Sequence, residues 1–273
     1  GLITSEYKKL DDLPFGYERK YAAVLLRGKE KNKIILKGKT DEVLSRCAYV
    51  CCGGETVPMP EDGKKQADEA VGDMLADGMK VLAVAEKVTD SEGLAESDIS
   101  DMALIGFVVF FDAPKKSAKN AVKKLQAGAV DVVVLTGDDL EVAMSVCKRI
   151  GIPCDSAVTG KMLEGLSDAE LNAELKKTKL FAELTPDQKV RIVNGLKAIG
   201  HTVGFLGDGI NDIPAMCAAD VAISVDTAED AAKEVADVLL LEKDLNVLSG
   251  GITEGRKICT NVQKYVKITA SSN

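Results

Sequence analysis

The sequence has no Trp, one His, and aromatic residues at only 4% of its 273 positions. With so few rings, we expect aliphatic cores, and a composition rich in Ala, Val, Leu, Ile and Gly is typical of parallel α/β proteins. No apolar run approaches the ~18 residues that a membrane-spanning helix needs, and no signal peptide is recognisable. We therefore expect the residues present to be soluble, whatever the protein they come from.

The cysteines number seven, and no two form a CxxC pair. Cys47, Cys51 and Cys52 lie close together, but the single histidine, His201, is far away in the sequence. This pattern favours free thiols in a reducing compartment over a zinc site. The net charge of −8 argues against nucleic acid or an anionic lipid surface as the main partner. A phosphate ligand remains compatible with it, because a local cluster of Lys overrides the global sign.

From Gly106 onward, short apolar runs alternate with amphipathic segments, which predicts parallel βαβ units. The predicted strands are 106–111, 130–135, 180–182, 202–206, 220–224 and 237–241. The predicted helices lie near 116–127, 139–150, 167–177, 186–199, 212–218 and 228–236, and a long final helix covers 245–267.

The pattern of the first hundred residues predicts an α+β module with an antiparallel sheet, because two or more strands come before any helix. The predicted strands are 21–28, 33–38 and 81–87, with a hairpin at 53–58, helices near 40–47 and 62–77, and a polar loop at 88–101. We place the domain boundary near Asp112-Ala113-Pro114, where Pro stiffens a hinge.

The strongest chemical motif is TVGFLGDGINDIPA at 202–215, where an apolar strand ends in Gly207-Asp208-Gly209 and Asn211-Asp212 follow at the head of a helix. Ligands of open α/β sheets bind beyond the carboxyl ends of the strands. Two carboxylates and an amide are hard oxygen ligands that suit Mg²⁺ holding a phosphate. The alternative is an ordinary strand-to-helix turn, where Asp, Gly and Asn are common.

Two further strand ends carry polar residues. Thr136-Gly137-Asp138 follows the strand at 130–135, and its hydroxyl and backbone N–H groups suit phosphoryl oxygens, or serve only as a helix cap. Lys189 lies in the first turns of the helix that begins at Thr185-Pro186. A lone Lys there is normally a solvated surface charge, but beside a phosphoryl group it would contribute roughly 4 kcal/mol of gross attraction.

Thr, Lys and Asp at three strand ends make up most of a haloacid-dehalogenase-type phosphoryl-transfer site. The nucleophile of such a site is an Asp after a first strand, and neither DKTGT nor a DxDx(T/V) pattern follows an apolar run here. Asp112 in VVFFDAPK is the nearest mimic. With Pro114 two residues later, it is a poor candidate.

TGD, TPDQK and GDGINDIPA, in this order and at these intervals, resemble the phosphorylation domain of P-type ATPases. DAPK resembles the hinge motif of that family, with Ala113 and Lys115 as departures. The resemblance covers nearly the whole chain. The segments AISVDTAEDAAKEVADVLLLEKDLNVL and GRKICTNVQKYVKITASSN resemble the bacterial magnesium-transporting subgroup.

The resemblance also implies a nucleotide site in the first domain. PFGYERK is similar to the family segment in which Phe15 would stack on adenine with Lys20 near the base. LKGKTDEVL points to Lys37 and Gly38, and DGMKVLAVA offers Lys80 where the family commonly has an Arg. Without the resemblance, Phe15 is more often a core anchor, and Lys20 and Lys37 are charges at strand edges.

The resemblance implies a nucleotide-binding domain at 1–111 and a phosphorylation domain of the Rossmann-like haloacid dehalogenase type at 112–273, cut so that the DKTGT strand and the membrane helices are absent. The parent would be an ATP-driven cation pump, with magnesium as its expected cargo, on the cytoplasmic side of a bacterial membrane. ATP would bind the first domain, and Asp208 and Asp212 would hold Mg²⁺. Thr136, Gly137 and Lys189 would bind the transferring oxygens, and Asn211 a phosphate oxygen.

Two alternative functions and two consequences accompany this interpretation. A soluble phosphatase that uses Asp112 and a non-catalytic nucleotide-binding module are the competing functions. The chain alone is expected to bind ATP weakly and not to hydrolyse it. Without its first strand, the second domain would keep an open sheet edge through which two copies could associate.

Overall fold

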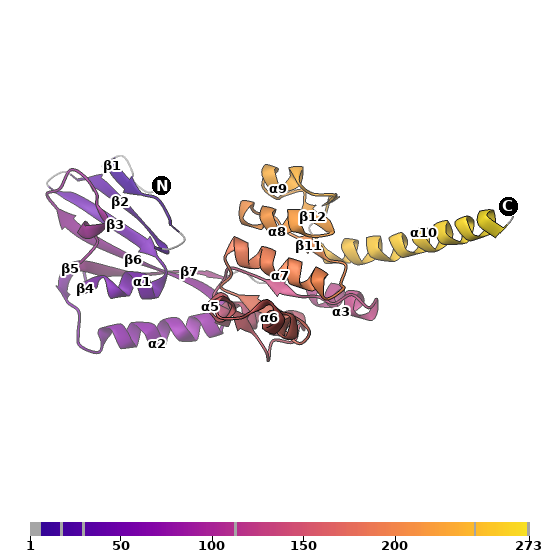
Figure 1. Cartoon of the computed structure of the whole chain (residues 1–273). Coiled ribbons are helices and arrows are strands. Elements are labelled where there is room, and N and C mark those ends of the chain that lie inside the picture. Colours follow the sequence, from indigo (N-terminus) through magenta and orange to yellow (C-terminus); the bar gives the residue numbers. More distant parts are fainter. Residues whose placement is uncertain (1–6, 17–18, 29–30, 112–113, 243, 272–273) are drawn as a thin grey trace. The chain divides into compact units, whose positions relative to one another are not determined.

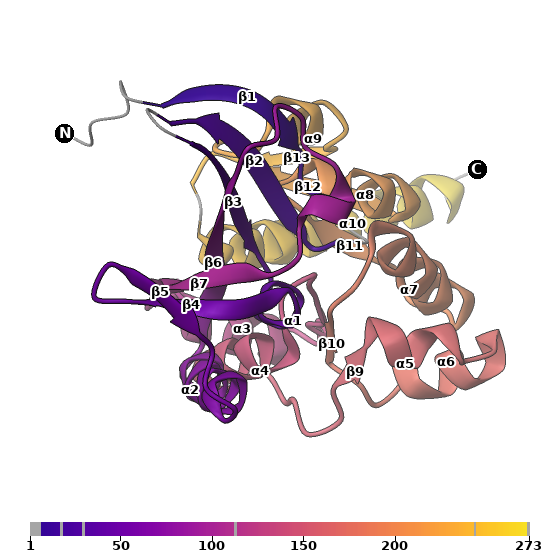
Figure 2. The same cartoon turned by 90° about the vertical axis from the view of Figure 1, so that its left-hand side faces the viewer.

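The computed structural model describes residues 7–16, 19–28, 31–111, 114–242 and 244–271. The chain divides into two compact units, Gly1–Asp112 and Ala113–Asn273 (Figures 1 and 2). Asp112 and Ala113 of the expected hinge lie outside the described residues, and Pro114 is the first described residue of the second unit.

The first unit contains one large sheet, which has seven strands within the described residues and pairs mainly in the antiparallel sense. Only β4 and β7 run parallel to each other. In spatial order the strands are β1 (Lys8–Leu13), β2 (Tyr21–Arg27), β3 (Asn32–Gly38), β6 (Met79–Thr89), β7 (Met102–Phe111), β4 (Cys47–Cys52) and β5 (Glu55–Pro58).

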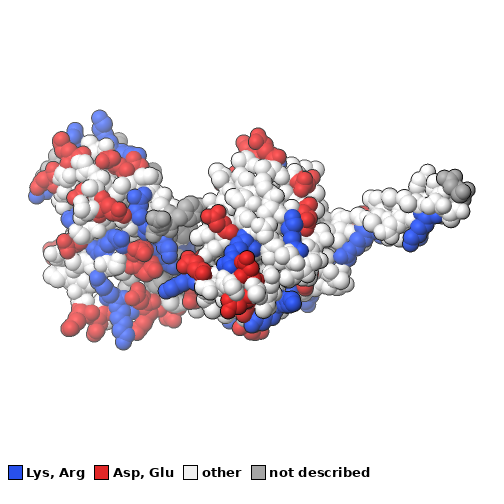
Figure 3. All heavy atoms as spheres, viewed as in Figure 1, with Lys and Arg blue, Asp and Glu red and all other residues white. Residues whose placement is uncertain are grey.

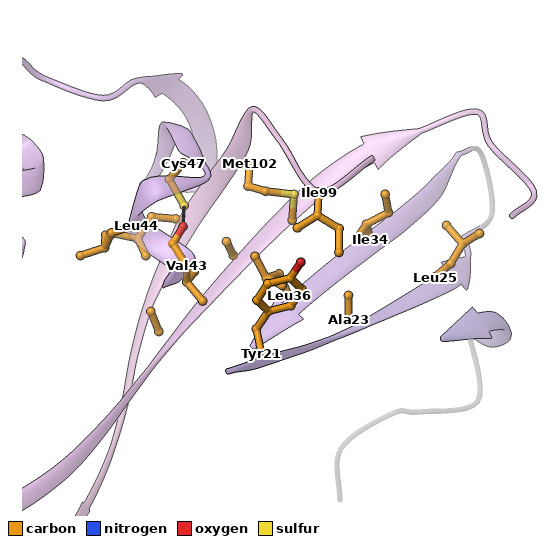
Figure 4. Packing of buried hydrophobic residues seen from close by; sticks show 13 residues of the cluster. Tyr21, Ala23, Leu25, Ile34, Leu36, Val43, Leu44, Cys47, Ile99 and Met102 are labelled. Atoms are coloured by element: carbon orange, nitrogen blue, oxygen red, sulfur yellow. Dashed lines mark hydrogen bonds between the residues drawn. The ribbon is translucent and has the colours of Figure 1, made fainter. Parts of the chain in front are cut away.

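The core of this unit lies on one face of the sheet, because alternate residues of each strand point to the same side. In β2 and β3 the inward residues are Leu25, Ile34 and Leu36, which are fully buried (Figure 4). Helices α1 (Thr40–Ser45) and α2 (Gly63–Ala76) both contact β6. The short helix η1 (Glu96–Asp98) closes the same side, where the Tyr21 hydroxyl donates to Glu96 Oε1 at 3.0 Å.

Within its described residues, the second unit contains two small parallel sheets. The first has the order β8 (Val134–Leu135), β10 (Leu180–Ala182), β9 (Val158–Thr159). The second has the order β11 (Gly204–Leu206), β12 (Val221–Val225), β13 (Val238–Leu240). The helices are α3 (Ala118–Ala127), α4 (Leu140–Ile150), α5 (Gly160–Glu164), α6 (Asp168–Leu175), α7 (Pro186–Ala198), η2 (Ile210–Asp212), α8 (Ile213–Ala218), α9 (Asp230–Glu234) and α10 (Leu245–Ser271).

A leucine of the first small sheet also packs against the core of the second. Leu135 of β8 packs against the cluster around Phe205 of β11 and also against the cluster around Phe181 of β10. Within the described residues, β8 pairs only with β10 and β11 only with β12. Each sheet therefore ends in a strand with one unpaired edge.

Helix α10 packs at its start and extends outward from its own unit. Lys124 Nζ of α3 donates to Asn246 Oδ1 at 3.0 Å, and Arg256 donates to the Gly128 carbonyl. From Thr253 onward every described residue of the helix is exposed. Ile258, Val262 and Val266 recur along one side, whereas the charged side chains visible along this part in Figure 3 are Lys and Arg. No helix of the described chain is long and apolar enough to cross a bilayer.

The mixed α/β prediction is confirmed, but the strand expected at 106–111 belongs to β7 of the first sheet, antiparallel to β6, and the parallel strands of the second unit come after it. The expectation of aliphatic cores was wrong at three positions of the described chain, because Tyr21, Phe181 and Phe205 are buried, the first two as the largest of the fully buried side chains. All seven cysteines are free thiols. Strands β1, β4 and β9 and helix α5 were not predicted, and the strand expected at 130–135 is limited to Val134–Leu135.

Candidate functional site

Two of the predicted polar loops in the second unit are tied together by their backbones. Leu184 N donates to Thr136 O and Glu183 N donates to Asp138 O, both at 3.0 Å. Within the first loop, Asp138 N donates to Thr136 Oγ1 at 3.0 Å. Because β8 and β10 are parallel, their carboxyl ends meet at one edge of the sheet, where ligands of such sheets bind.

The loop after β10 leads directly into α7, whose start is firmly fixed. Thr185 and Gln188 form a reciprocal capping box, in which Thr185 Oγ1 accepts from Gln188 N and Gln188 Oε1 accepts from Thr185 N. Gln188 Nε2 also donates to Gly160 O at 2.9 Å. A Cβ at Gly160 would lie 2.4 Å from the backbone oxygen of Glu183, so this close approach needs a glycine.

Lys189 follows in the same helix turn, and its ammonium donates to Asp212 Oδ1 at 2.7 Å. Only 10% of the Lys189 side chain and 18% of the Asp212 side chain are exposed. A charge in such surroundings needs a partner, since an unpaired buried charge is strongly unfavourable. The structure thus joins the Lys189 motif to the motif at 202–215 by a direct ion pair.

The third loop, Gly207-Asp208-Gly209, is packed against the residue that pairs with Lys189. A Cβ at Gly207 would lie 2.7 Å from Asp212 Cβ and 2.9 Å from Met216 Sδ. Asp208 is exposed, and its carbonyl accepts a hydrogen bond from Glu229 N at 3.0 Å. The loop therefore presents an exposed carboxylate above a mostly buried Lys189–Asp212 pair.

The oxygen donors of this region suit an open Mg²⁺ site, which phosphate and water oxygens would complete. The described residues include no group of three or more His, Cys, Asp or Glu side chains arranged as a closed metal site. One oxygen of Asp212 is engaged by Lys189, and Asp208 is exposed beside it. Mg²⁺ is commonly held by one or two carboxylates together with phosphate and water oxygens. Asp208 and Asp212 suit such an open site.

The remaining predicted residues of this group lie in the same loops. Gly137 is exposed between Thr136 and Asp138, and exposed Asn211 lies in η2. The catalytic and metal-binding roles of the seven residues in these loops remain predictions. They are Thr136, Gly137, Asp138, Lys189, Asp208, Asn211 and Asp212.

Two of the predicted nucleotide residues of the first unit, Lys37 and Lys80, lie on the face of the sheet opposite its core. Lys37 pairs with Val84 and Ala22, and Lys80 lies two alternations before Val84 on β6. Both lysines therefore project from the same face. Its apolar residues Ala22, Val24, Ile35, Leu82 and Val84 are only partly buried.

Phe15 and Lys20 lie in the connection between β1 and β2. Phe15 is 58% exposed, so it is not the core anchor that an isolated Phe usually becomes. Lys20 has a φ of 56°, and its N–H donates to Gly16 O at 2.7 Å, which closes a tight turn before β2. The Lys20 carbonyl accepts from Lys39 N at 2.9 Å and so ties this turn to the end of β3.

Gly38 has a clear packing reason for its identity. It is buried opposite Tyr21, and a Cβ there would lie 2.4 Å from Tyr21 Cβ and 2.6 Å from Lys20 O. Its predicted contact with a nucleotide, like the contacts of Phe15, Lys20, Lys37 and Lys80, remains a prediction.

Three residues that support these loops were not singled out from the sequence. Gln188 was detectable, because Thr185-x-x-Gln188 has the spacing of a capping box. Gly160 and the buried Ser224, whose hydroxyl donates to Gly207 O at 2.9 Å, gave no local signal.

Known proteins resemble this chain along almost its full length. A family profile described as "P-type ATPase, cytoplasmic domain N" matches residues 2–117. The magnesium-transporting ATPase, P-type 1, of Escherichia coli strain K12 is 43% identical over 274 residues, which cover 99% of this chain and 30% of that protein. The protein of the same name from Salmonella typhimurium strain LT2 is 42% identical, with the same coverage.

A more distant relative is named for a different ion. The endoplasmic reticulum calcium ATPase srcA of Aspergillus fumigatus is 32% identical over 277 residues, which cover 95% of this chain and 28% of that protein. The chain thus spans less than a third of the length of the curated relatives it matches. With one profile over its first unit and these relatives along both units, the chain belongs to the P-type ATPase family.

Proposed function

We propose that this chain supplies the ATP-binding and phosphoryl-transfer parts of an ATP-driven cation transporter that works through an aspartyl phosphate. Magnesium is the proposed cargo, because the relatives at 41–43% identity are named magnesium-transporting ATPases. The parent would be a translocase of the bacterial cell membrane, with this chain on its cytoplasmic side. The observation that carries the proposal is the ion pair between Lys189 and Asp212 beside exposed Asp208.

We assign nucleotide binding to residues 1–111 and phosphoryl transfer to 112–273, the latter with a haloacid-dehalogenase-type sheet. Support comes from Leu135 of β8, which packs against the cluster that contains Phe205 of β11, and from the edges of β8 and β11 that are unpaired within the described residues. One parallel strand between them would join the two small sheets, and the acceptor aspartate would follow that strand. In this chain alone, the same edges would allow two copies to associate, which sedimentation at increasing concentration would detect.

In the phosphoryl-transfer unit, the chain's own groups would bind and orient the reacting oxygens. The Thr136 hydroxyl, the Gly137 N–H and the Lys189 ammonium would contact the transferring phosphoryl group, and the Asn211 amide would hold one of its oxygens. The ion pair with Asp212 restrains the position of the Lys189 ammonium before substrate arrives. Mg²⁺ held by Asp208 and Asp212 would supply neutralisation of the charge on the phosphoryl oxygens.

In the nucleotide-binding unit, Phe15 would stack on adenine with Lys20 near the base, Lys37 would line the same site, and Lys80 would attract the phosphates. The exposed ring of Phe15 and the shared face of Lys37 and Lys80 support this assignment. Stacking of one base would contribute ~1–3 kcal/mol. Lys80 offers a single point charge instead of a bidentate fork, so we expect weak binding, with Kd about millimolar.

Titration of the full chain with ATP, followed by NMR, tests the nucleotide site. Phe15→Ala should weaken binding about ten-fold if stacking contributes as above. Tyr49→Ala, which removes an exposed aromatic side chain of β4, should leave the affinity unchanged. Equal effects of the two variants, or no chemical-shift change with ATP, would contradict the assignment. The chain alone should not turn ATP over, and steady turnover that Asp208→Ala abolishes would contradict that expectation.

Phosphorylation is tested in a longer chain that restores the strand with the acceptor aspartate. Lys189→Ala and Asp208→Asn should each abolish or strongly reduce phosphoenzyme formation from ATP. Lys161→Ala, which alters a lysine in α5, should leave it intact. Unchanged phosphorylation in the first two variants would favour a non-catalytic nucleotide-binding module instead.

A further inference from the structure

Ser224 is a buried polar residue in the middle of β12, with no exposed surface. Its hydroxyl donates to the Gly207 carbonyl at 2.9 Å. The neighbouring strand positions are Val, Ala, Ile and Val, so the hydroxyl is an exception within an apolar strand. A buried hydroxyl is unfavourable unless it is hydrogen-bonded, and an Ala would fill almost the same space without that requirement.

The two successive peptide groups that precede Asp208 are each held by a hydrogen bond. Gly207 N donates to Ile223 O at 3.0 Å, and Gly207 O accepts from Ser224. The next carbonyl, that of Asp208, accepts from Glu229 N at 3.0 Å. Gly207 is buried and has no side chain of its own that could hold the peptide by a hydrogen bond. The Ser224 hydroxyl therefore restrains the Gly207–Asp208 peptide through its carbonyl.

The same glycine also contacts the neighbouring ion pair. A Cβ at Gly207 would lie 2.7 Å from Asp212 Cβ, so Asp212 rests directly on this part of the backbone. Asp212 in turn accepts the hydrogen bond from Lys189. A shift of the Gly207 peptide would therefore move Asp208 and disturb the pair beside it.

We propose that Ser224 is a positioning residue, which holds the Gly207–Asp208 peptide and thereby sets the direction of the Asp208 carboxylate toward a divalent cation. The inference rests on the proposed function of Asp208. It adds a residue of β12 that touches neither the cation nor a phosphate. Loss of its hydroxyl removes the partner of a buried carbonyl and frees the peptide to rotate.

The test compares Ser224→Ala with Thr178→Val in the full chain. Thr178 is also fully buried in the second unit, and its hydroxyl bonds to Glu174 away from the loop. Mn²⁺ serves as the probe, because its binding broadens the amide resonances of nearby residues. Amide exchange at Asp208 and Gly209 and urea denaturation are measured on the same samples.

Ser224→Ala should weaken Mn²⁺ binding about five-fold, the effect of one neutral hydrogen bond, and should accelerate exchange at Asp208 and Gly209. Thr178→Val should lose comparable stability with Mn²⁺ affinity unchanged. The proposal fails if Ser224→Ala binds Mn²⁺ as the native sequence does, or if Thr178→Val weakens binding equally. Asp208→Asn separates the proposed role of Asp208 from that of Ser224. If Asp208→Asn retains full Mn²⁺ binding, the proposed function of Asp208 fails. If Asp208→Asn loses binding but Ser224→Ala does not, only the role of Ser224 is overturned.

Discussion

Lys189 Nζ lies 2.7 Å from Asp212 Oδ1, and both side chains are more than four-fifths buried. Removing the cation leaves a carboxylate with little water around it. We expect Lys189→Met to lower the free energy of unfolding by roughly 3 kcal/mol, measured by urea denaturation. Adding Asp212→Asn should restore a large part of that loss. Additive effects of the two substitutions would show that the pair does not couple.

Gly207 and Gly209 flank Asp208 but tolerate a side chain very differently. A Cβ at Gly207 would meet Asp212 and Met216 below 3 Å, whereas a Cβ at Gly209 meets nothing within 4 Å. Gly209 also has an extended backbone, with φ −121° and ψ 164°. Gly207→Ala should therefore destabilise the unit by about 1–3 kcal/mol, and Gly209→Ala should be close to neutral. Comparable denaturation midpoints for the two variants would contradict this account.

Gly38 is expected to be essential for packing in the first unit. A Cβ there would collide with Tyr21 Cβ at 2.4 Å, on the backbone of a central strand pair. Gly38→Ala should destabilise by about 2–3 kcal/mol, seen as a lower melting temperature. Gly72→Ala is the matched control, since this position in α2 has open space around it and should gain about 0.5–1 kcal/mol. A stabilised Gly38→Ala variant would rule out the close contact.

The thiols should react in two groups. Burial raises the pKa of the Cys47 and Cys147 thiols to about 11 from 9.0, and Cys154 adds to the effect at Cys147. Cys52, Cys217 and Cys259 are exposed. Because the thiolate is the nucleophile, alkylation of the native chain should modify the exposed group first and Cys47 and Cys147 only after unfolding. Mass spectrometry of timed samples checks the order, and early modification of Cys147 would refute it.

The same two thiols predict a stability change in alkali. Their pKa is raised on folding, so the folded chain holds its protons where the unfolded chain releases them. Their contribution to stability is complete below about pH 9 and declines as the pH rises toward about 11. Urea denaturation across this range should show a smaller decline in Cys147→Ala than in the native sequence, while Cys259→Ala should follow the native sequence.

The sequence predicted best what depends on local pattern. Alternation in β2, β3 and β6 gave strands, and Thr185-Pro186 gave the start of α7. Strand β8 is shorter than its apolar run because its ladder with β10 starts only where Leu180 pairs with Val134. The charged β1 and the two-residue β9 owe their conformation to their partners, and no local signal marks them.

Within the candidate site, the loops were predictable and their contacts were not. Three apolar runs ending in polar residues indicated where chemistry gathers. The ion pair of Lys189 with Asp212 joins residues that are 23 positions apart in the chain. The hydrogen bond of Ser224 to the Gly207 carbonyl joins residues that are 17 positions apart. Such pairs are set by the packing of α7, η2 and β12, which no short window of sequence contains.

The outer part of α10 has little to hold it except its own hydrogen bonds. Isolated helices shorter than ~12–15 residues are marginal in water, and this stretch carries several β-branched residues and exposed apolar side chains. Unwinding should therefore begin at Ser271 and progress inward, and circular dichroism or amide protection would record it. Covering the apolar side formed by Ile258, Val262 and Val266 would stabilise these last turns. Their helical content would consequently rise when that side becomes covered.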